Sequence, residues 1–123
     1  MALDIALKIY IPEKLITHKK VYRVVLPYKG NTLTVIKGRA PTLLPLEMGA
    51  VKILDESNRA VEEYYISGGA ADIKEDTCTI LTEAVFEKNS LDLAKAKALN
   101  EEFPNPFYAW LEKVYETDKA FRP

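Results

Sequence analysis

The chain has 123 residues with 17 basic and 18 acidic side chains, which gives a formal net charge of −1. This length suffices for one domain with a hydrophobic core, and the balanced charge offers no basic surface for nucleic acid or anionic lipid. No apolar run approaches the roughly 20 residues of a membrane-spanning helix, and the first residues lack the basic start and cleavage site of a signal peptide. We therefore expect a soluble, cytoplasmic protein.

The first two thirds of the chain predict short strands. Between residues 3 and 11, apolar side chains alternate with polar or small ones, a period of two that places one face in a core. Further strands are predicted at residues 21–26, 33–36, 43–46, 50–54, 61–66, 70–73 and 77–85, with turn residues between them. Pro45 makes its segment an edge or irregular strand. Eight or more strands without a helix among them favour an antiparallel β-sandwich or barrel.

The composition changes near Lys88, and a helix is expected over residues 91–103. Ser90 is the expected N-cap, with Asp92 in the first turn, where a carboxylate complements the helix dipole. Side chains on related turns are predicted to form one face of this helix: Leu91, Ala94, Lys95, Ala98, Leu99 and Glu102.

A second helix is predicted after Pro104-Asn105-Pro106, because proline lacks an amide donor and ends the first helix. Its apolar side chains recur at steps of three and four residues: Phe107, Trp110, Leu111, Val114 and Tyr115. Its polar side chains are expected to face outward: Glu112, Lys113, Glu116 and Asp118. We therefore predict a β-domain over residues 1–87 and a helical hairpin over residues 88–123.

Few residues can carry chemistry. His18 is the single histidine and Cys78 the single cysteine, so the familiar zinc sites and catalytic triads cannot be assembled. We expect His18 on the surface and Cys78 buried in a strand as a small apolar side chain. Gly68-Gly69 lacks the lysine and helix that follow a phosphate-binding loop, so it is expected to form a turn. The sequence thus predicts no catalytic residue and no metal site.

A series of motifs in fixed order carries a family resemblance. Residues 7–14 form a strand that ends in a proline-glutamate turn, and residues 24–27 begin the next one. Gly38-Arg39-Ala40-Pro41 and Gly49 follow, then a late hairpin at residues 66–69 and 79–81, from which the pattern continues without a gap to residue 96. Over roughly residues 3–100 the chain resembles the epsilon subunit of rotary F-type ATP synthases.

The resemblance implies a mainly β fold, an antiparallel ten-stranded β-sandwich followed by a short α-helical hairpin. It also implies a non-catalytic rotor subunit that links the gamma subunit to the c-ring, peripheral on the inner face of an energy-transducing membrane. Contact with the membrane would come only through the complex, and contact with the alpha/beta catalytic head is left open. Matching motif positions are expected at the partner contacts: Thr32, Arg39, Ala40 and Pro41 near the ring, and Leu43 and Leu44 near gamma.

Some bacterial members of this family bind a regulatory ATP at the start of the first helix. The matching positions here are Leu91, Asp92, Lys95 and Ala96, with Glu83 upstream. Lys95 stands where the family has arginine, and an ammonium lacks the planar fork that bridges two oxygens. A helix start with a dipole-matching Asp92 is the alternative reading. No cofactor is expected apart from this ATP, which is left open.

The chain departs from the family pattern in two regions. Near the predicted ring contact, Arg39 replaces the usual histidine, Lys37 a proline and Thr34 a glycine. The second helix is short and aromatic, whereas inhibition in the family uses a long basic helix. The basic residues in the predicted second helix of this chain and just after it are Lys113, Lys119 and Arg122. The alternative function is a free-standing β-sandwich adaptor that binds a partner through its aromatic C-terminal helix, with Phe107, Trp110, Leu111 and Tyr115 as the anchor.

Overall fold

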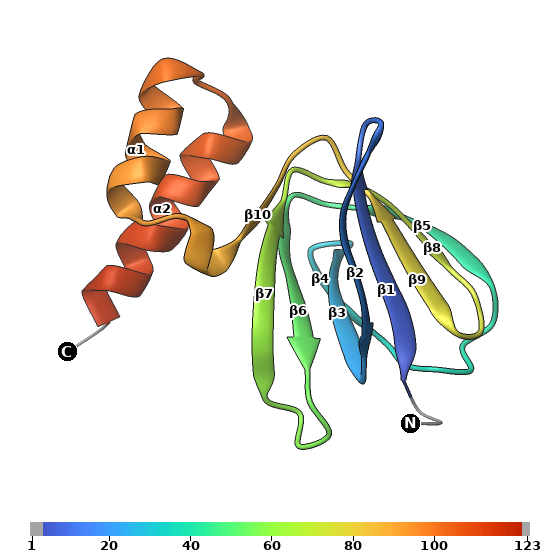
Figure 1. Ribbon diagram of the computed structural model, residues 1–123. Helices are drawn as coiled ribbons and strands as arrows, with labels where there is room; N and C mark the ends of the chain where they lie inside the picture. The colour runs from blue at the N-terminus through green and yellow to red at the C-terminus, as the bar shows by residue number, and fades with distance from the viewer. Residues whose placement is uncertain (1–3, 122–123) are drawn as a thin grey trace. The chain divides into compact units, whose positions relative to one another are not determined.

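The computed structural model of the chain describes residues 4–121, with side chains described for residues 4–117. Ten strands form two five-stranded sheets, and two α-helices follow them (Figure 1). The predicted ten-stranded β-sandwich with a C-terminal helical pair is thereby confirmed.

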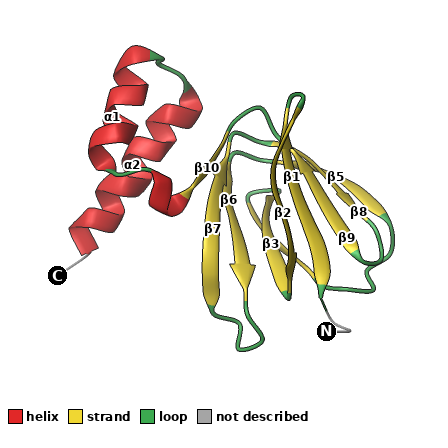
Figure 2. Cartoon of the chain, in the orientation of Figure 1, coloured by secondary structure: helices red, strands yellow, loops and turns green. Residues whose placement is uncertain are grey.

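The first sheet has the strand order β2-β1-β9-β8-β5 (Figure 2). Its strands are β1 (Ile5–Ile11), β2 (Lys14–Val21), β5 (Thr42–Leu46), β8 (Gly69–Ile73) and β9 (Thr77–Leu81). β1 and β9 pair in parallel, so this sheet is not antiparallel throughout, whereas β1 with β2, β8 with β9 and β5 with β8 are antiparallel. β5 lies at an edge, as the proline within it predicts.

The second sheet has the strand order β10-β7-β6-β3-β4. Its strands are β3 (Arg23–Tyr28), β4 (Asn31–Val35), β6 (Gly49–Leu54), β7 (Ala60–Ile66) and β10 (Val85–Glu87). β3 with β4, β3 with β6 and β6 with β7 pair antiparallel. Connections of two and five residues join β3 to β4 and β6 to β7, which are usual lengths for hairpin loops.

Two of the sequence-based strand assignments are wrong. β2 was not predicted, because its apolar side chains, Leu15, Ile16 and Val21, do not alternate with its polar ones. It lies at an edge of the sheet, where its lysines oppose pairing with other chains. The predicted strand over residues 77–85 is in fact two strands, since β9 ends at Leu81. There the buried Thr82 turns the chain, and its hydroxyl donates to the carbonyl oxygen of Ala84 at 3.2 Å.

A single apolar core lies between the sheets. In β1 alone, Ile5, Leu7 and Ile9 are at most 1% exposed, which confirms the predicted alternation. Burial of each such side chain stabilises the fold by roughly 1.5–3 kcal/mol relative to leaving it exposed. Every other strand except β10 also contributes to the core: Val21, Val24, Leu26, Val35, Leu44, Leu46, Val51, Ile53, Tyr64, Ile66, Ala71, Ile73, Cys78 and Ile80.

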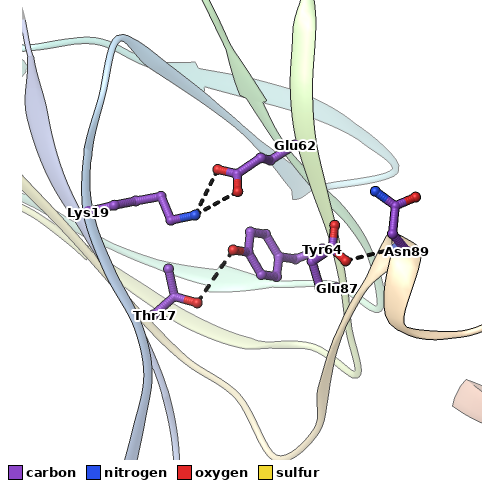
Figure 3. Close-up of polar contacts among 6 residues, drawn as sticks. All are labelled: Thr17, Lys19, Glu62, Tyr64, Glu87 and Asn89. Atoms are coloured by element: carbon purple, nitrogen blue, oxygen red, sulfur yellow. Dashed lines mark hydrogen bonds and ion pairs between the residues drawn. The ribbon is translucent and has the colours of Figure 1, made fainter.

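An ion pair joins the edge strand β2 to the opposite sheet. The Lys19 ammonium donates to both carboxylate oxygens of Glu62 on β7, at 2.6 and 2.8 Å, and the Thr17 hydroxyl lies 3.5 Å from the Tyr64 hydroxyl (Figure 3). Burial lowers the pKa of Lys19, but hydrogen bonds to Glu62 and Tyr64 outweigh it, so the pKa is raised overall. Because both side chains are 35% exposed, the pair contributes at most about 1 kcal/mol.

The chain divides into two compact units, with the boundary between Val85 and Phe86. The second unit contains a 3₁₀ turn (Lys88–Ser90) and the helices α1 (Leu93–Glu102) and α2 (Pro106–Phe121). Among the described residues, neither helix is long and apolar enough to cross a membrane.

The start of α1 corrects the predicted cap. Asp92 is the N-cap, and its carboxylate accepts from the Lys95 amide at 2.8 Å. Ser90 lies in the preceding 3₁₀ turn, where its hydroxyl donates to the carbonyl oxygen of Glu87 at 2.7 Å. Asp92 caps the helix in place of Ser90 because its carboxylate lies three residues before the Lys95 amide, which has no partner within the helix.

The buried face of α1 also differs from the predicted one. Ala96 is fully buried, and Leu93, Leu99 and Asn100 are half-buried. Most of the predicted face is exposed: Ala94, Lys95, Ala98 and Glu102. The prediction counted helical turns from Leu91, which lies before the helix, so the whole face was rotated.

Aromatic side chains fix α2 within the second unit. The Phe107 ring stacks on those of Phe86 and Trp110, with centroids 6.1 and 6.2 Å apart, and the Tyr115 hydroxyl donates to the carbonyl oxygen of Lys88 at 2.6 Å. Phe107, Leu111 and Tyr115 are buried, which confirms the predicted apolar stripe. The predicted outward residues Lys113 and Glu116 are exposed, Glu112 is half-buried, and Asp118 lies outside the described side chains.

Candidate functional site

The residues predicted to contact the ring separate toward the two ends of β4. Thr32 is exposed and pairs with Pro27, one step from the β3–β4 turn. Arg39, Ala40 and Pro41 lie in the loop that follows the other end of β4. Thr32 lies three strand residues, or about 10 Å, before the end of β4 that leads into the loop, so it is not part of the cluster that the loop forms.

The loop after β4 is held to the first sheet. The Gly38 amide donates to the carbonyl oxygen of Glu75, in the turn between β8 and β9, at 2.7 Å. Ala40 and Pro41 are exposed, while Arg39 is half-buried. The loop therefore presents a small apolar surface beside a guanidinium at one end of the sandwich.

The β3–β4 turn at the opposite end is rigidly built. Lys29 and Gly30 have φ values of 51° and 72°, the left-handed geometry of a two-residue hairpin turn. The Glu47 carboxylate accepts from the Gly30 amide with both oxygens, at 2.9 and 2.8 Å. Thr32 is thus presented on a fixed turn.

The predicted gamma contacts on β5 point in opposite directions. Leu43 is 71% exposed, whereas Leu44 is 8% exposed and belongs to the core. Neighbouring side chains on a strand alternate between its faces, so of this pair Leu43 is the one that the first sheet presents outward.

Strand register reveals an apolar row across the outer face of the first sheet. Tyr10 of β1 pairs with Leu15 of β2 and with Leu81 of β9, and Ala70 of β8 pairs with Leu81 and with Pro45 of β5. None of these five residues is buried. We call Leu15, Tyr10, Leu81, Ala70 and Pro45 the outer apolar row. The row could not be predicted from the sequence, because it depends on long-range register, including the parallel pairing of β1 with β9.

A shallow pocket of about 360 Å³ adjoins the outer apolar row. Its lining comes from the row, the β1–β2 turn, the start of β8 and the end of β9: Tyr10, Ile11, Pro12, Glu13, Gly69, Leu81, Thr82 and Glu83. The Thr82 amide donates to the carbonyl oxygen of Tyr10 at 3.0 Å, which ties the two sides of the pocket together. Both charged residues of the lining, Glu13 and Glu83, are exposed glutamates.

The predicted nucleotide-binding residues divide between the two units. Glu83 belongs to the first unit, while Leu91, Asp92, Lys95 and Ala96 belong to the second. One Asp92 oxygen is engaged in the helix cap, Ala96 is fully buried, and Lys95 is exposed. The contacts around Asp92 are those of a capped helix start, the alternative that the sequence left open.

Replacing Asp92 with alanine should weaken the start of α1. We expect a loss of about 1 kcal/mol of helix stability, because the Lys95 amide loses its partner. Ser90→Ala is the matched control and should cost less, since Ser90 does not cap the helix. Amide hydrogen exchange at Lys95 and Ala96 measures the difference. Equal exchange in the two variants would mean that Asp92 is not the cap.

The two residues with the most reactive side-chain types are not assembled into a site. His18 is exposed on β2, as predicted. Cys78 is fully buried in β9, also as predicted, and burial followed by the nearby Asp72 charge raises the pKa of its thiol to about 12. Within the described part of the chain, no three histidine, cysteine, aspartate or glutamate residues lie together as a metal site.

Cys78 should be unreactive in the folded protein. Alkylation by iodoacetamide requires an accessible thiolate, so native chain should stay unmodified at pH 8 and react only after unfolding, as mass spectrometry would show. The raised pKa also links folding to pH. Stability from the neutral thiol is complete below the unfolded pKa near 9 and is lost as the pH rises toward about 12. Rapid alkylation of the native chain would contradict this burial.

Comparisons with known proteins agree on one family. The family model described as ATP synthase, delta/epsilon chain, β-sandwich domain, matches residues 4–88. The ATP synthase epsilon chain of Rhizobium meliloti (strain 1021) is 33% identical over 92 residues, covering 75% of this chain and 68% of its own. That of Anoxybacillus flavithermus (strain DSM 21510 / WK1) is 36% identical over 73 residues, covering 59% and 53%.

Solved structures share the fold. A chain in the mitochondrial ATP synthase of Euglena gracilis, solved as OSCP/F1/c-ring, aligns with a TM-score of 0.66 at 21% identity, covering 91% of this chain and 74% of its own. One in the central stalk/c-ring structure of the Tetrahymena thermophila enzyme aligns with a TM-score of 0.55 at 18% identity, covering 83% and 76%.

Proposed function

Because the chain belongs to the family of ATP synthase epsilon subunits, we propose that it is a non-catalytic central-stalk subunit that links the gamma subunit to the c-ring. The observation that carries this proposal is the ten-stranded sandwich, since the family match spans nearly all of it. Transmission of torque needs a stiff body with separate contact surfaces. A close-packed core between two sheets supplies the stiffness.

The exposed residues of the sandwich suggest how the contacts are divided. We assign ring contact to the loop of Arg39, Ala40 and Pro41, and gamma contact to the outer face of the first sheet, including Leu43. Thr32, near the other end of β4, would meet a different part of a partner. Leu44 would act from within the core by supporting β5.

The proposed location follows from these partners. A subunit that binds gamma and the c-ring would sit on the inner, cytoplasmic face of an energy-transducing membrane, and would be peripheral to it. The near-neutral charge of the chain supports attachment through protein partners, because direct binding to anionic lipid needs clustered basic residues.

The adaptor alternative is disfavoured by the second unit. Its proposed anchor needs an unoccupied aromatic face, yet Phe107 is 6% exposed and stacks on Phe86, and Leu111 is fully buried. Tyr115 is buried and hydrogen-bonded to Lys88. A partner groove could reach these side chains only after the second unit opens.

Regulation by ATP or through the catalytic head remains a separate proposal with weaker support. Asp92 already caps α1, so ATP would compete with that bond or use the second carboxylate oxygen. Calorimetry with ATP on the native chain and on Asp92→Ala tests this. No heat in either titration would overturn nucleotide binding, whereas heat that Asp92→Ala abolishes would support it.

Proton pumping tests the proposed function. The test uses membranes that contain the cognate synthase stripped of its epsilon subunit. When this chain is added, the membranes should recover ATP-driven acidification, which a pH-sensitive dye measures. An unchanged gradient, with the chain folded by circular dichroism, would count against a rotor role. Ser57→Ala, in the exposed turn between β6 and β7 and outside the residues assigned to the partner contacts, should restore pumping as well as the native chain does.

A further inference from the structure

The outer face of the first sheet changes character from one row of side chains to the next. The outer apolar row crosses all five strands. The adjacent row, set by the same register, is polar until it reaches Leu43: His18, Lys8, Thr79, Asp72 and Leu43. A band of apolar side chains with a polar border is typical of a protein-binding surface.

A bulge in β2 widens the apolar side of this face. The register of β2 against β1 shifts between Ile9 and Tyr10, so β2 has one extra residue there. Leu15 and Ile16 are consequently both exposed, at 44% and 38%. With Leu81 at 51% exposure, large aliphatic groups lie on both sides of the Tyr10 ring in the row.

Charge differs between the two sides of the row. The pocket side carries Glu13 and Glu83, the two charged residues among its lining. The adjacent polar row instead carries Lys8 on β1 and His18 on β2 at one end, and Asp72 on β8 toward the other. A cationic group would therefore be favoured at the pocket and disfavoured beside Lys8 at the β1–β2 end of the polar row, which gives a bound segment a direction.

We propose that the pocket binds an arginine or lysine side chain of a protein partner, beside a large apolar side chain of the same segment that packs on Tyr10 and Leu81. The inference rests on the proposed function for the partner, which is the gamma subunit. A volume of about 360 Å³ accommodates one long side chain rather than a folded element. A guanidinium can reach carboxylates from its planar edge while its stem lies on apolar surface.

Binding of purified gamma subunit, measured by calorimetry, tests the charged half of the site. The double variant E13Q/E83Q should bind gamma about 5- to 10-fold more weakly, because two exposed ion pairs are lost. The deficit should shrink at 0.5 M salt, where such pairs are screened. The matched control E56Q/E75Q removes the same charge from exposed turns elsewhere and should bind as the native chain does.

Two truncations, one within the outer apolar row and one outside it, test the apolar half of the proposed binding site. Leu81→Ala should weaken binding about 10-fold with no change in salt dependence, because the lost contact is apolar. Val61→Ala, which truncates a side chain 57% exposed on β7, is the control and should bind normally. Circular dichroism and urea titration establish that each variant is folded. Native affinity for gamma in both E13Q/E83Q and Leu81→Ala would overturn the proposal while leaving the rotor role intact.

A second experiment tests the chemistry of the pocket independently of the gamma subunit. The dipeptide Ac-Trp-Arg-NH₂, at millimolar concentration, should shift the amide signals of Ile11, Gly69 and Leu81 in the native chain, and shift them less in E13Q/E83Q. If native chain fails to bind gamma, the rotor assignment falls, and the dipeptide alone decides the pocket. Absence of these shifts, or equal shifts in both proteins, would overturn the pocket chemistry.

Discussion

Substitution of Gly69 by alanine should destabilise the sandwich more than the same substitution at any other glycine of the chain. A Cβ atom at this position would lie 1.9 Å from the carbonyl oxygen of Leu81, which is backbone and cannot move aside. The φ of +137° adds strain of its own for any residue with a side chain. We expect a loss of about 4 kcal/mol or more, a large part of a domain's usual stability.

Urea unfolding followed by circular dichroism measures this loss, with Gly30→Ala as the control. Gly30 also has a positive φ, of +72°, but nothing lies within 4 Å of its added Cβ. Its substitution should cost only about 1–2 kcal/mol, from backbone strain. A difference of less than about 1 kcal/mol between the variants would show that β8 does not approach β9 as closely as the structure indicates.

Leu44→Ala and Leu43→Ala form the second informative pair. Leu44 is 8% exposed in the core, so its truncation should cost about 2–5 kcal/mol by leaving a cavity. Leu43 is 71% exposed, so its truncation should change stability by less than about 0.5 kcal/mol. Thermal and urea unfolding of both variants provide the measurement.

The same pair separates stability from binding. Leu43→Ala should weaken association with gamma while the chain keeps its native stability. Leu44→Ala should reduce the folded fraction, with normal affinity in the part that stays folded. The opposite assignment, with Leu44→Ala stable and Leu43→Ala unfolded, would mean that β5 is shifted by one residue, since a one-residue slip exchanges the two faces of a strand.

Alternation and turn chemistry were enough to predict most of the sandwich. The period of two in β1 predicted a strand with one buried face, and the proline in β5 predicted an edge or irregular strand; the structure has the first and an edge strand for the second. β2 was missed because its apolar side chains, Leu15, Ile16 and Val21, do not alternate with polar ones. The break after Leu81 escaped prediction because it depends on the burial of Thr82, which the local sequence does not reveal.

The candidate site was harder to predict from the sequence, because part of it depends on contacts between residues that are distant in the chain. Arg39, Ala40 and Pro41 are consecutive, so a motif could place them together. Tyr10 and Leu81 are 71 positions apart in the sequence, and only the parallel pairing of β1 with β9 makes them neighbours. The prediction of the helix cap failed for a different reason. Ser90 and Asp92 are both good capping residues, and the local 3₁₀ turn decides between them, because it engages the Ser90 hydroxyl and leaves Asp92 three residues before the Lys95 amide.

Assembly with both rotor partners tests the central claim most directly. Purified chain, gamma subunit and c-ring, mixed and analysed by size-exclusion chromatography with light scattering, should elute as one complex that contains all three. Omission of this chain should weaken the association of gamma with the ring. Elution of the folded chain by itself, with gamma and the ring associating equally well without it, would contradict a role in linking them.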